Sequence, residues 1–196
     1  VNPFYEHFPG KRRLPGYSEP QVGLAYLASS LTSAIDGVTV GITDQCIENL
    51  DDGALLRQIR DRNPAVVGFY SSTLTIDRVA RLGRQIKELC PQTVTVIGGP
   101  HVSTLPGDLP AAMNVGVIGE GEHTFAQVVQ RALAHQGFEG VAGVVHREKD
   151  AIVKEPSRPR IEDIDAIPFP AHSLLLEKGY VYQYPVRSVH PHYLSV

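Results

Sequence analysis

Residues 65–74 read Ala65-Val66-Val67-Gly68-Phe69-Tyr70-Ser71-Ser72-Thr73-Leu74, an apolar run followed by a turn rich in hydroxyl groups. Two later stretches have the same design, one ending in Gly98-Gly99-Pro100-His101 and the other in Gly119-Glu120-Gly121-Glu122. Short apolar runs bounded by turn residues are typical of buried strands. Because the carboxyl ends of parallel strands meet at one edge of a sheet, we expect the three turns to lie together where such sheets bind ligands.

Segments with helical spacing of apolar residues separate the predicted strands. The predicted helices span residues 20–37, 51–63, 76–89 and 124–133, with a short helical turn at 109–113. The predicted strands span residues 38–42, 65–70, 93–97 and 114–118. Strands that alternate with helices imply a parallel sheet with right-handed crossovers. The predicted fold class is therefore α/β, a Rossmann-like (flavodoxin-like) doubly wound parallel sheet that extends to about residue 137.

The pattern changes after this domain. Val141–Arg147 and Ala151–Lys154 flank Glu148-Lys149-Asp150, an arrangement that predicts a β-hairpin. Four prolines between residues 156 and 170 then mark an extended Pro-rich linker. The predicted organisation is a domain at 1–137, a hairpin extension at 138–155 and a linker at 156–196.

Composition excludes several classes of function. The 18 Lys and Arg residues nearly balance the 21 Asp and Glu residues, for a net charge of −3, which argues against a nucleic-acid partner. No apolar run approaches the roughly 20 residues that cross a bilayer, so no membrane partner is expected. Cys46 and Cys90 lie far apart, which fits a reducing, cytoplasmic setting and excludes an iron–sulfur or structural zinc centre built from cysteines of this chain. The chain opens with Val1 and ends in a strand-like run, so we expect it to be part of a larger protein.

Known ligand-binding motifs fit poorly. Gly119-Glu120-Gly121 is followed by Thr124 where a dinucleotide fingerprint has its third glycine, and no P-loop motif occurs. Glu122 is expected to stabilise the start of a helix, and Glu120 to contact a ligand. His101 follows two glycines at the end of a strand, a position at which ligand contact is as good an interpretation as the commoner structural role of a loop histidine.

Six short segments follow one another along nearly the whole chain. They are Val1-Asn2-Pro3, Gly23–Ala28, Val67–Thr73, Val96–His101, Val117–Phe125 and Ile161–Ala171. In this order they resemble the cobalamin-binding domain at the amino end of cobalamin-dependent radical S-adenosylmethionine enzymes. The resemblance implies that these residues hold cobalamin and that the chain by itself binds the cofactor without catalysing a reaction.

The same resemblance implies what the parent enzyme contains. In the family the pattern continues into a carboxyl-terminal radical S-adenosylmethionine domain, in which C-x-x-x-C-x-x-C binds a [4Fe–4S] cluster and S-adenosylmethionine. That motif does not occur in these 196 residues. The implied partner is therefore such a domain of the same chain, and the implied activity of the whole protein is methyl transfer.

The resemblance also implies which residues hold the cofactor. Cobalamin-binding folds that coordinate cobalt from below use D-x-H-x-x-G in the first loop, with S-x-L and G-G turns on the nucleotide tail. Here the first loop reads Tyr5-Glu6-His7-Phe8-Pro9-Gly10, so His7 is the candidate cobalt ligand while Tyr5 replaces the Asp that would orient it. Relatives commonly lack the lower histidine, so the lower ligand stays open. The residues expected to contact cobalamin are Asn2, Pro3, Tyr5, His7, Ser71, Ser72, Thr73, Leu74, Gly98, Gly99, Pro100, His101, Gly119, Glu120 and Gly121.

Two alternatives to cobalamin binding remain at this point. The first is a divergent domain of the same lineage that has lost its corrinoid and serves as a scaffold or docking module. The second is a stand-alone small-molecule or response-regulator-like α/β domain. The second is disfavoured because the acidic residues that accept a phosphoryl group after the first strand are missing.

Overall fold

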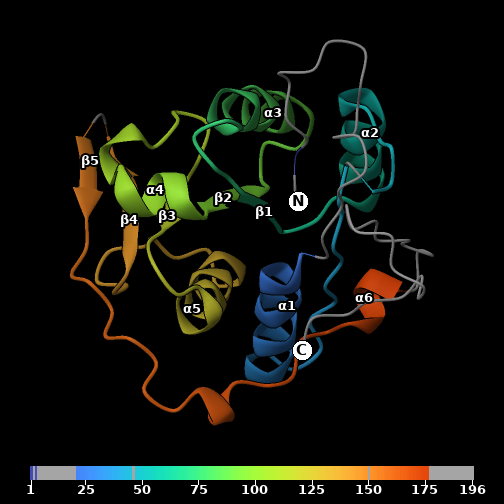
Figure 1. The fold of residues 1–196 in the computed structure, drawn as a ribbon. Coiled ribbons are helices and arrows are strands. Elements are labelled where there is room, and N and C mark those ends of the chain that lie inside the picture. Colours follow the sequence, from blue (N-terminus) through green and yellow to red (C-terminus); the bar gives the residue numbers. More distant parts are fainter. Residues whose placement is uncertain (2, 4–20, 46, 150, 177–196) are drawn as a thin grey trace.

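A five-stranded sheet lies between two layers of helices in the computed structural model, which describes residues 1, 3, 21–45, 47–149 and 151–176 (Figure 1). The strands are β1 (Val66–Tyr70), β2 (Val94–Gly98), β3 (Val115–Val117), β4 (Val144–Glu148) and β5 (Ala151–Lys154). The helices are α1 (Val22–Ala34), α2 (Asp52–Arg62), α3 (Ile76–Leu89), α4 (Pro100–Thr104), α5 (Glu122–Leu133) and α6 (Ser173–Leu176). Two 3-10 turns complete the described elements, η1 (Pro106–Asp108) and η2 (Ile164–Ala166).

The strands follow one another across the sheet in the order β1-β2-β3-β4-β5. β1, β2 and β3 are parallel, with Gly68 beside Val96 and Val96 beside Val115. β4 pairs antiparallel with β3, and β5 pairs antiparallel with β4, so the predicted hairpin extends the sheet. Val1 lies along the other side of β1, where its amino group donates to Gly68 O at 2.6 Å and its carbonyl accepts from Tyr70 N at 3.0 Å. The α/β Rossmann-like class predicted from the sequence is confirmed.

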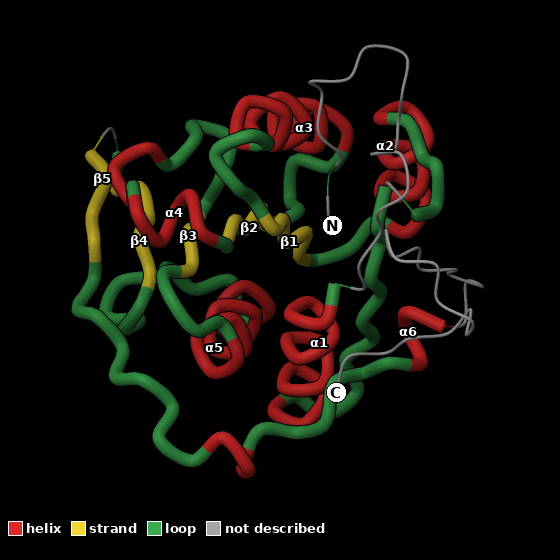
Figure 2. Tube along the Cα trace, viewed as in Figure 1, coloured by secondary structure: helices red, strands yellow, loops and turns green. Residues whose placement is uncertain are grey.

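Helices cover both faces of the sheet, with α2 and α3 on one face and α1 and α5 on the other (Figures 1 and 2). Alternation along β1 sends Val67 and Phe69 into the core under α2 and α3, where they join Leu82 and Ile86. Gly68 faces the opposite layer, where an added Cβ would lie 3.4 Å from the ring of Phe125. The two apolar layers fix the parallel strands and therefore fix where their carboxyl ends emerge.

Two predicted elements differ from the structure. Residues 38–42, expected to form a strand, carry no sheet ladder, because Val40 and Ile42 pack instead against Ala25, Ala28 and Leu175. The helical turn expected at 109–113 is a single hydrogen-bonded turn, in which Met113 N donates to Pro110 O at 2.9 Å, and the helical elements α4 and η1 lie before it, each with a proline at its start.

The segment after β5 runs back across the outer surface of α5 and α1 (Figure 1). Gly143 N donates to Pro156 O at 2.8 Å, Ser29 Oγ donates to Pro168 O at 3.3 Å, and Ala171 N donates to Ala25 O at 3.1 Å. We call residues 156–171 the strap. Its contacts place the carboxyl end of the described chain beside α1.

Within the described part of the chain, the helices are too short or too polar to cross a membrane.

Candidate functional site

The three turns singled out in the sequence meet at the carboxyl edge of the sheet. Ser71 N donates to Gly98 O at 2.8 Å, and the His101 N–H donates to Ser71 O at 3.3 Å. These bonds join the turn after β1 to the turn after β2. The turn after β3 joins them through Gly119 N, which donates to Ser103 Oγ of α4 at 3.0 Å.

The hydroxyl groups of the first turn differ in their surroundings. Ser71 is fully buried, and its hydroxyl donates to Ser72 O at 3.1 Å and lies 3.3 Å from Thr75 Oγ1. The Ser72 N–H donates to Thr75 Oγ1 at 3.0 Å, which closes the turn at the start of α3. Ser72 Oγ is buried and has no hydrogen-bond partner among the described residues, while Thr73 and Leu74 are exposed. The Ser71 hydroxyl therefore stabilises the turn from within. Ser72 Oγ has no partner among the described residues, and Thr73 and Leu74 are exposed to solvent.

Glycines shape the second turn. Gly99 has φ +105°, and an added Cβ would lie 2.6 Å from Ser71 O, so a side chain is excluded there by strain and by contact. An added Cβ at Gly98 would meet Val117 only at ordinary distance, 3.9 Å. Gly98 is half-buried and presents only backbone at this edge, and Pro100 begins α4 in an exposed position.

His101 is buried rather than presented at the edge. The residue is 5% exposed, its Nδ1 lies 3.2 Å from Thr73 Oγ1, and its Nε2 lies 3.8 Å from the Asp108 carboxylate. Its side chain therefore links the turn after β2 to the turn after β1.

The third turn connects the sheet edge to the strap. Gly119 has φ +76° with open space around it, and an added Cβ at Gly121 would lie 2.8 Å from Leu27 of α1. The Glu120 carboxylate accepts from Ile161 N at 2.7 Å. Glu122 lies in the first turn of α5, where a carboxylate is favourable.

Four predicted contact residues lie at the amino end of the chain. Pro3 is buried, whereas Asn2, Tyr5 and His7 lie outside the described residues. In the described ranges, no group of three or more His, Cys, Asp or Glu side chains could hold a metal ion.

Sequence reasoning missed the partners that hold these turns. Thr75, Ser103 and Ile161 each make one of the contacts above. Thr75 carries a signal, because a hydroxyl three residues after Ser72 at the start of a helix suits such a turn. Ser103 carries none, and Ile161 was singled out only as the first residue of the sixth segment, without its partner, because both partners are distant in sequence.

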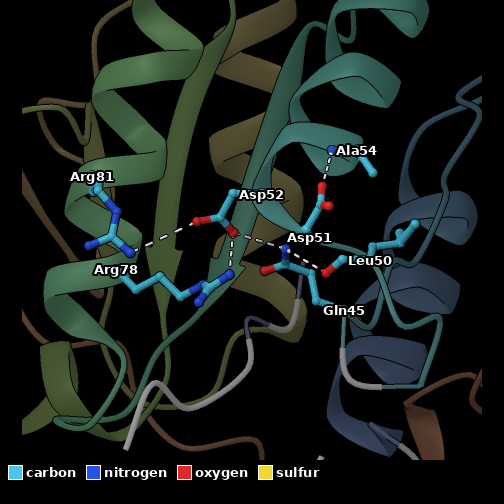
Figure 3. Close-up of polar contacts among 7 residues, drawn as sticks. All are labelled: Gln45, Leu50, Asp51, Asp52, Ala54, Arg78 and Arg81. Carbon is cyan, nitrogen blue, oxygen red and sulfur yellow. Dashed lines mark hydrogen bonds and ion pairs between the residues drawn. The ribbon is translucent and has the colours of Figure 1, made fainter. Parts of the chain in front are cut away.

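A buried ion pair braces the start of α3 (Figure 3). The Asp52 carboxylate at the start of α2 accepts from Arg78, which is 4% exposed, and from Gln45 Nε2 at 3.2 Å. Arg81 lies 3.9 Å from the same carboxylate. Asp51 caps α2 by accepting from Ala54 N at 2.7 Å. Because α3 begins just after the first turn, this cluster fixes the direction in which that turn leaves β1.

Two groups with perturbed pKa values lie away from the three turns. Burial lowers the pKa of Lys87, whose ammonium donates to Thr93 O and Asn114 Oδ1, both at 2.6 Å. The hydrogen bond from His146 on β4, 2.9 Å long, lowers the pKa of the Glu155 carboxyl. Both groups therefore lie outside the candidate site, where the three turns contribute hydroxyls, backbone groups and glycines.

Comparison with known protein families gives a match over more than half of the chain. Residues 13–129 match the model described as B12 binding domain. An uncharacterised methyltransferase of Pyrococcus horikoshii is 31% identical over 168 residues, covering 84% of this chain and 36% of that protein. An anaerobic magnesium-protoporphyrin IX monomethyl ester cyclase of Rubrivivax gelatinosus is also 31% identical, covering 83% of this chain and 30% of that protein. The chain thus spans about a third of the length of these relatives.

Solved structures share the fold at low sequence identity. The cobalamin-dependent S-adenosylmethionine radical enzyme OxsB, with aqua-cobalamin and S-adenosylmethionine bound, superposes with a TM-score of 0.71 at 13% identity, over 85% of this chain and 24% of that one. The radical S-adenosylmethionine methyltransferase TsrM of Kitasatospora setae, with cobalamin and a [4Fe–4S] cluster bound, gives a TM-score of 0.65 at 20% identity, over 86% of this chain and 30% of that one.

Proposed function

Because this chain belongs to the family of B12-binding domains, we propose that it holds cobalamin on the turns that follow β1, β2 and β3. The observation that carries the proposal is Ser72 Oγ, which is buried without a hydrogen-bond partner among the described residues, in the turn whose Ser71 N–H donates to Gly98 O. A buried hydroxyl without a partner costs free energy, and a ligand that bonds to it removes that cost. A flat aromatic base fits a surface that lacks a side chain, so the two features together suit the nucleotide tail of cobalamin.

The turns take different parts in this proposal. Ser72 bonds to the tail, Gly98 and Gly99 form the surface under it, and Leu74 and Pro100 lie at its border. Ser71 supports the turn from within, because its hydroxyl is already used. Gly119 and Gly121 contribute backbone, while Glu120 holds the strap.

The residues at the amino end enter the proposal through the family resemblance alone. Asn2, Pro3 and Tyr5 would lie below the corrin ring, and His7 remains the candidate lower ligand of cobalt. Bound cobalamin supplies a cobalt centre that can carry a methyl group.

For the whole protein we propose methyl transfer, with a carboxyl-terminal domain that binds a [4Fe–4S] cluster and S-adenosylmethionine. The supporting observations are the methyltransferase names among the relatives and the greater length of those proteins. The 2-(S-pantetheinyl)-carbapenam-3-carboxylate methyltransferase of Streptantibioticus cattleyicolor, for example, is 29% identical, and the match covers 21% of its length.

Titration with hydroxocobalamin, followed by its visible spectrum and by gel filtration, tests the binding proposal. We expect coloured protein with one corrinoid per chain. Ser72→Ala should bind roughly 3- to 10-fold more weakly, the value of one hydrogen bond. Gly98→Val should bind more weakly still, because its side chain would occupy the surface under the tail.

Gly107→Val is the matched control, since Gly107 lies in η1 with no atom within 4 Å of an added Cβ. It should bind as the unaltered chain does. A folded chain that stays colourless would refute the proposal and favour a scaffold role for the domain.

A further inference from the structure

His101 contacts the turn after β1 twice. Its backbone N–H donates to Ser71 O at 3.3 Å, and its Nδ1 lies 3.2 Å from Thr73 Oγ1. The imidazole is 5% exposed, whereas Thr73 is exposed at the edge of the sheet. A ligand on this edge can therefore reach Thr73 directly, and His101 only through it.

The surroundings of the imidazole decide which nitrogen carries its proton. Neutral histidine has one N–H donor and one lone-pair acceptor. Nε2 is buried without a hydrogen-bond partner in the described ranges, and the nearest acidic group is the Asp108 carboxylate at 3.8 Å. A lone pair facing a carboxylate is repelled, and an N–H facing it is attracted. The proton therefore belongs on Nε2, and Nδ1 is left as an acceptor.

This tautomer fixes the direction of the bond between the two side chains. Thr73 must donate its single hydroxyl proton to His101 Nδ1, so its oxygen offers only lone pairs to the edge. Ser72, whose hydroxyl has no partner among the residues described, keeps its proton for a ligand. The two neighbouring hydroxyls thus present opposite hydrogen-bonding chemistry.

We propose that His101 is a positioning residue that acts through Thr73, making this hydroxyl an acceptor for an N–H of a corrin side-chain carboxamide. The proposal rests on the proposed cobalamin site and assigns one contact within it. The carboxamides are N–H donors of the corrin ring, whereas the phosphate of the nucleotide tail is only an acceptor. The phosphate therefore cannot bond to the Thr73 oxygen, and the proposal assigns Thr73 to the ring and Ser72 to the tail.

Affinities of the full chain for two corrinoids test this assignment. Hydroxocobalamin carries the nucleotide tail, and dicyanocobinamide keeps the carboxamides but lacks the tail. We expect Thr73→Val to weaken binding of both by the same factor, roughly 3- to 10-fold. Ser72→Ala should weaken binding of hydroxocobalamin only.

Combined substitutions test whether His101 acts through Thr73. His101→Leu should weaken binding by the same factor as Thr73→Val, and the double variant should be no weaker than either single one. His101→Asn should recover most of the affinity that His101→Leu loses, because its side-chain oxygen can accept the Thr73 proton near the place of Nδ1. Circular dichroism melts of each variant check folding. If His101→Leu does not fold, the comparison of His101→Asn with Thr73→Val still tests the proposal.

Several results would overturn the inference. Additive losses in the double variant, or failure of His101→Asn to restore binding, would make His101 a merely structural residue. A Thr73→Val loss confined to hydroxocobalamin would place Thr73 on the tail instead of the ring. If the unaltered chain binds neither corrinoid, the proposed function itself is wrong, an outcome distinct from these.

Discussion

At the scale of single residues, position in the turn decides what a hydroxyl can do. Ser71, Ser72 and Thr73 are chemically similar, yet they differ in their surroundings. Ser71 is buried and bonded within the turn, Ser72 Oγ is buried without a partner among the described residues, and Thr73 is exposed and bonded to His101. The unsatisfied hydroxyl is the one that gains most from a ligand, because its desolvation is already incurred in the free protein.

Gly99 is the residue at which the fold tolerates a side chain least. Gly99→Ala should destabilise the protein by at least about 2 kcal/mol, since it adds a contact with Ser71 O to a strained backbone. Gly119→Ala separates the two causes, because Gly119 also has positive φ but has open space around it. It should cost about 1 kcal/mol, the strain alone. Urea unfolding of the three proteins measures the difference, and equal losses would mean that the contact with Ser71 is relieved at no cost.

At the scale of elements, one ion pair joins α2 to α3. Asp52→Asn replaces the carboxylate that accepts from the buried Arg78 guanidinium with a neutral amide, which should lower the free energy of unfolding by about 1.5–3 kcal/mol. Asp61→Asn is the control, since Asp61 pairs with Arg60 on the surface and should change stability by less than about 1 kcal/mol. Denaturant unfolding compares them. An Asp52 variant as stable as the control would show that the pair does not brace these helices.

Glu155, which directly follows β5, is an acidic group whose titration should affect the stability of the protein. Bonding to His146 lowers the pKa of Glu155 in the folded protein, so the ionised carboxylate stabilises the fold above its unfolded pKa. This contribution is lost as the pH falls below the ordinary value of 4.5 and through the lowered folded pKa. Glu155→Gln cannot titrate, so its stability deficit at pH 7 should shrink as the pH approaches 3. Unfolding at several pH values measures the deficit, and a constant deficit would contradict the assignment.

Among the elements, the sequence could predict those with a clear local periodicity, but not those that depend on contacts between distant residues. Helix α3 has the predicted bounds because Val79, Leu82 and Ile86 recur with helical spacing and all are buried. Residues 38–42 are apolar because Val40 and Ile42 pack on α1 and Leu175. Periodicity alone cannot distinguish such a buried segment from a strand of the sheet. The three turns were found because they follow strands. The burial of His101 and the bond from Ile161 to Glu120 depend on contacts between distant residues, which a local pattern does not contain.

At the scale of the whole molecule, the strap connects the sheet edge with the far side of α1. Its hydrogen bonds include those to Gly143 before β4, to Glu120 in the turn after β3, and to Ser29 and Ala25 of α1. The contact with Glu120 belongs to the turn after β3, which is part of the proposed cobalamin site. A change in the position of that turn would therefore shift the strap directly, because one charge-assisted hydrogen bond joins Glu120 to Ile161.

Hydrogen exchange can test whether Glu120 holds the strap in this way. Glu120→Ala removes the acceptor of the Ile161 amide, so exchange at Ile161 should accelerate by roughly tenfold or more, the value of a bond to a charged group. Glu120→Gln keeps an acceptor oxygen and should change exchange less. The Ala171 amide, bonded to Ala25 O, is the internal control and should exchange equally in all three proteins. Acceleration at both amides would mean that the strap opens as one unit, whereas no change at Ile161 would mean that its position is set by the outer contacts alone.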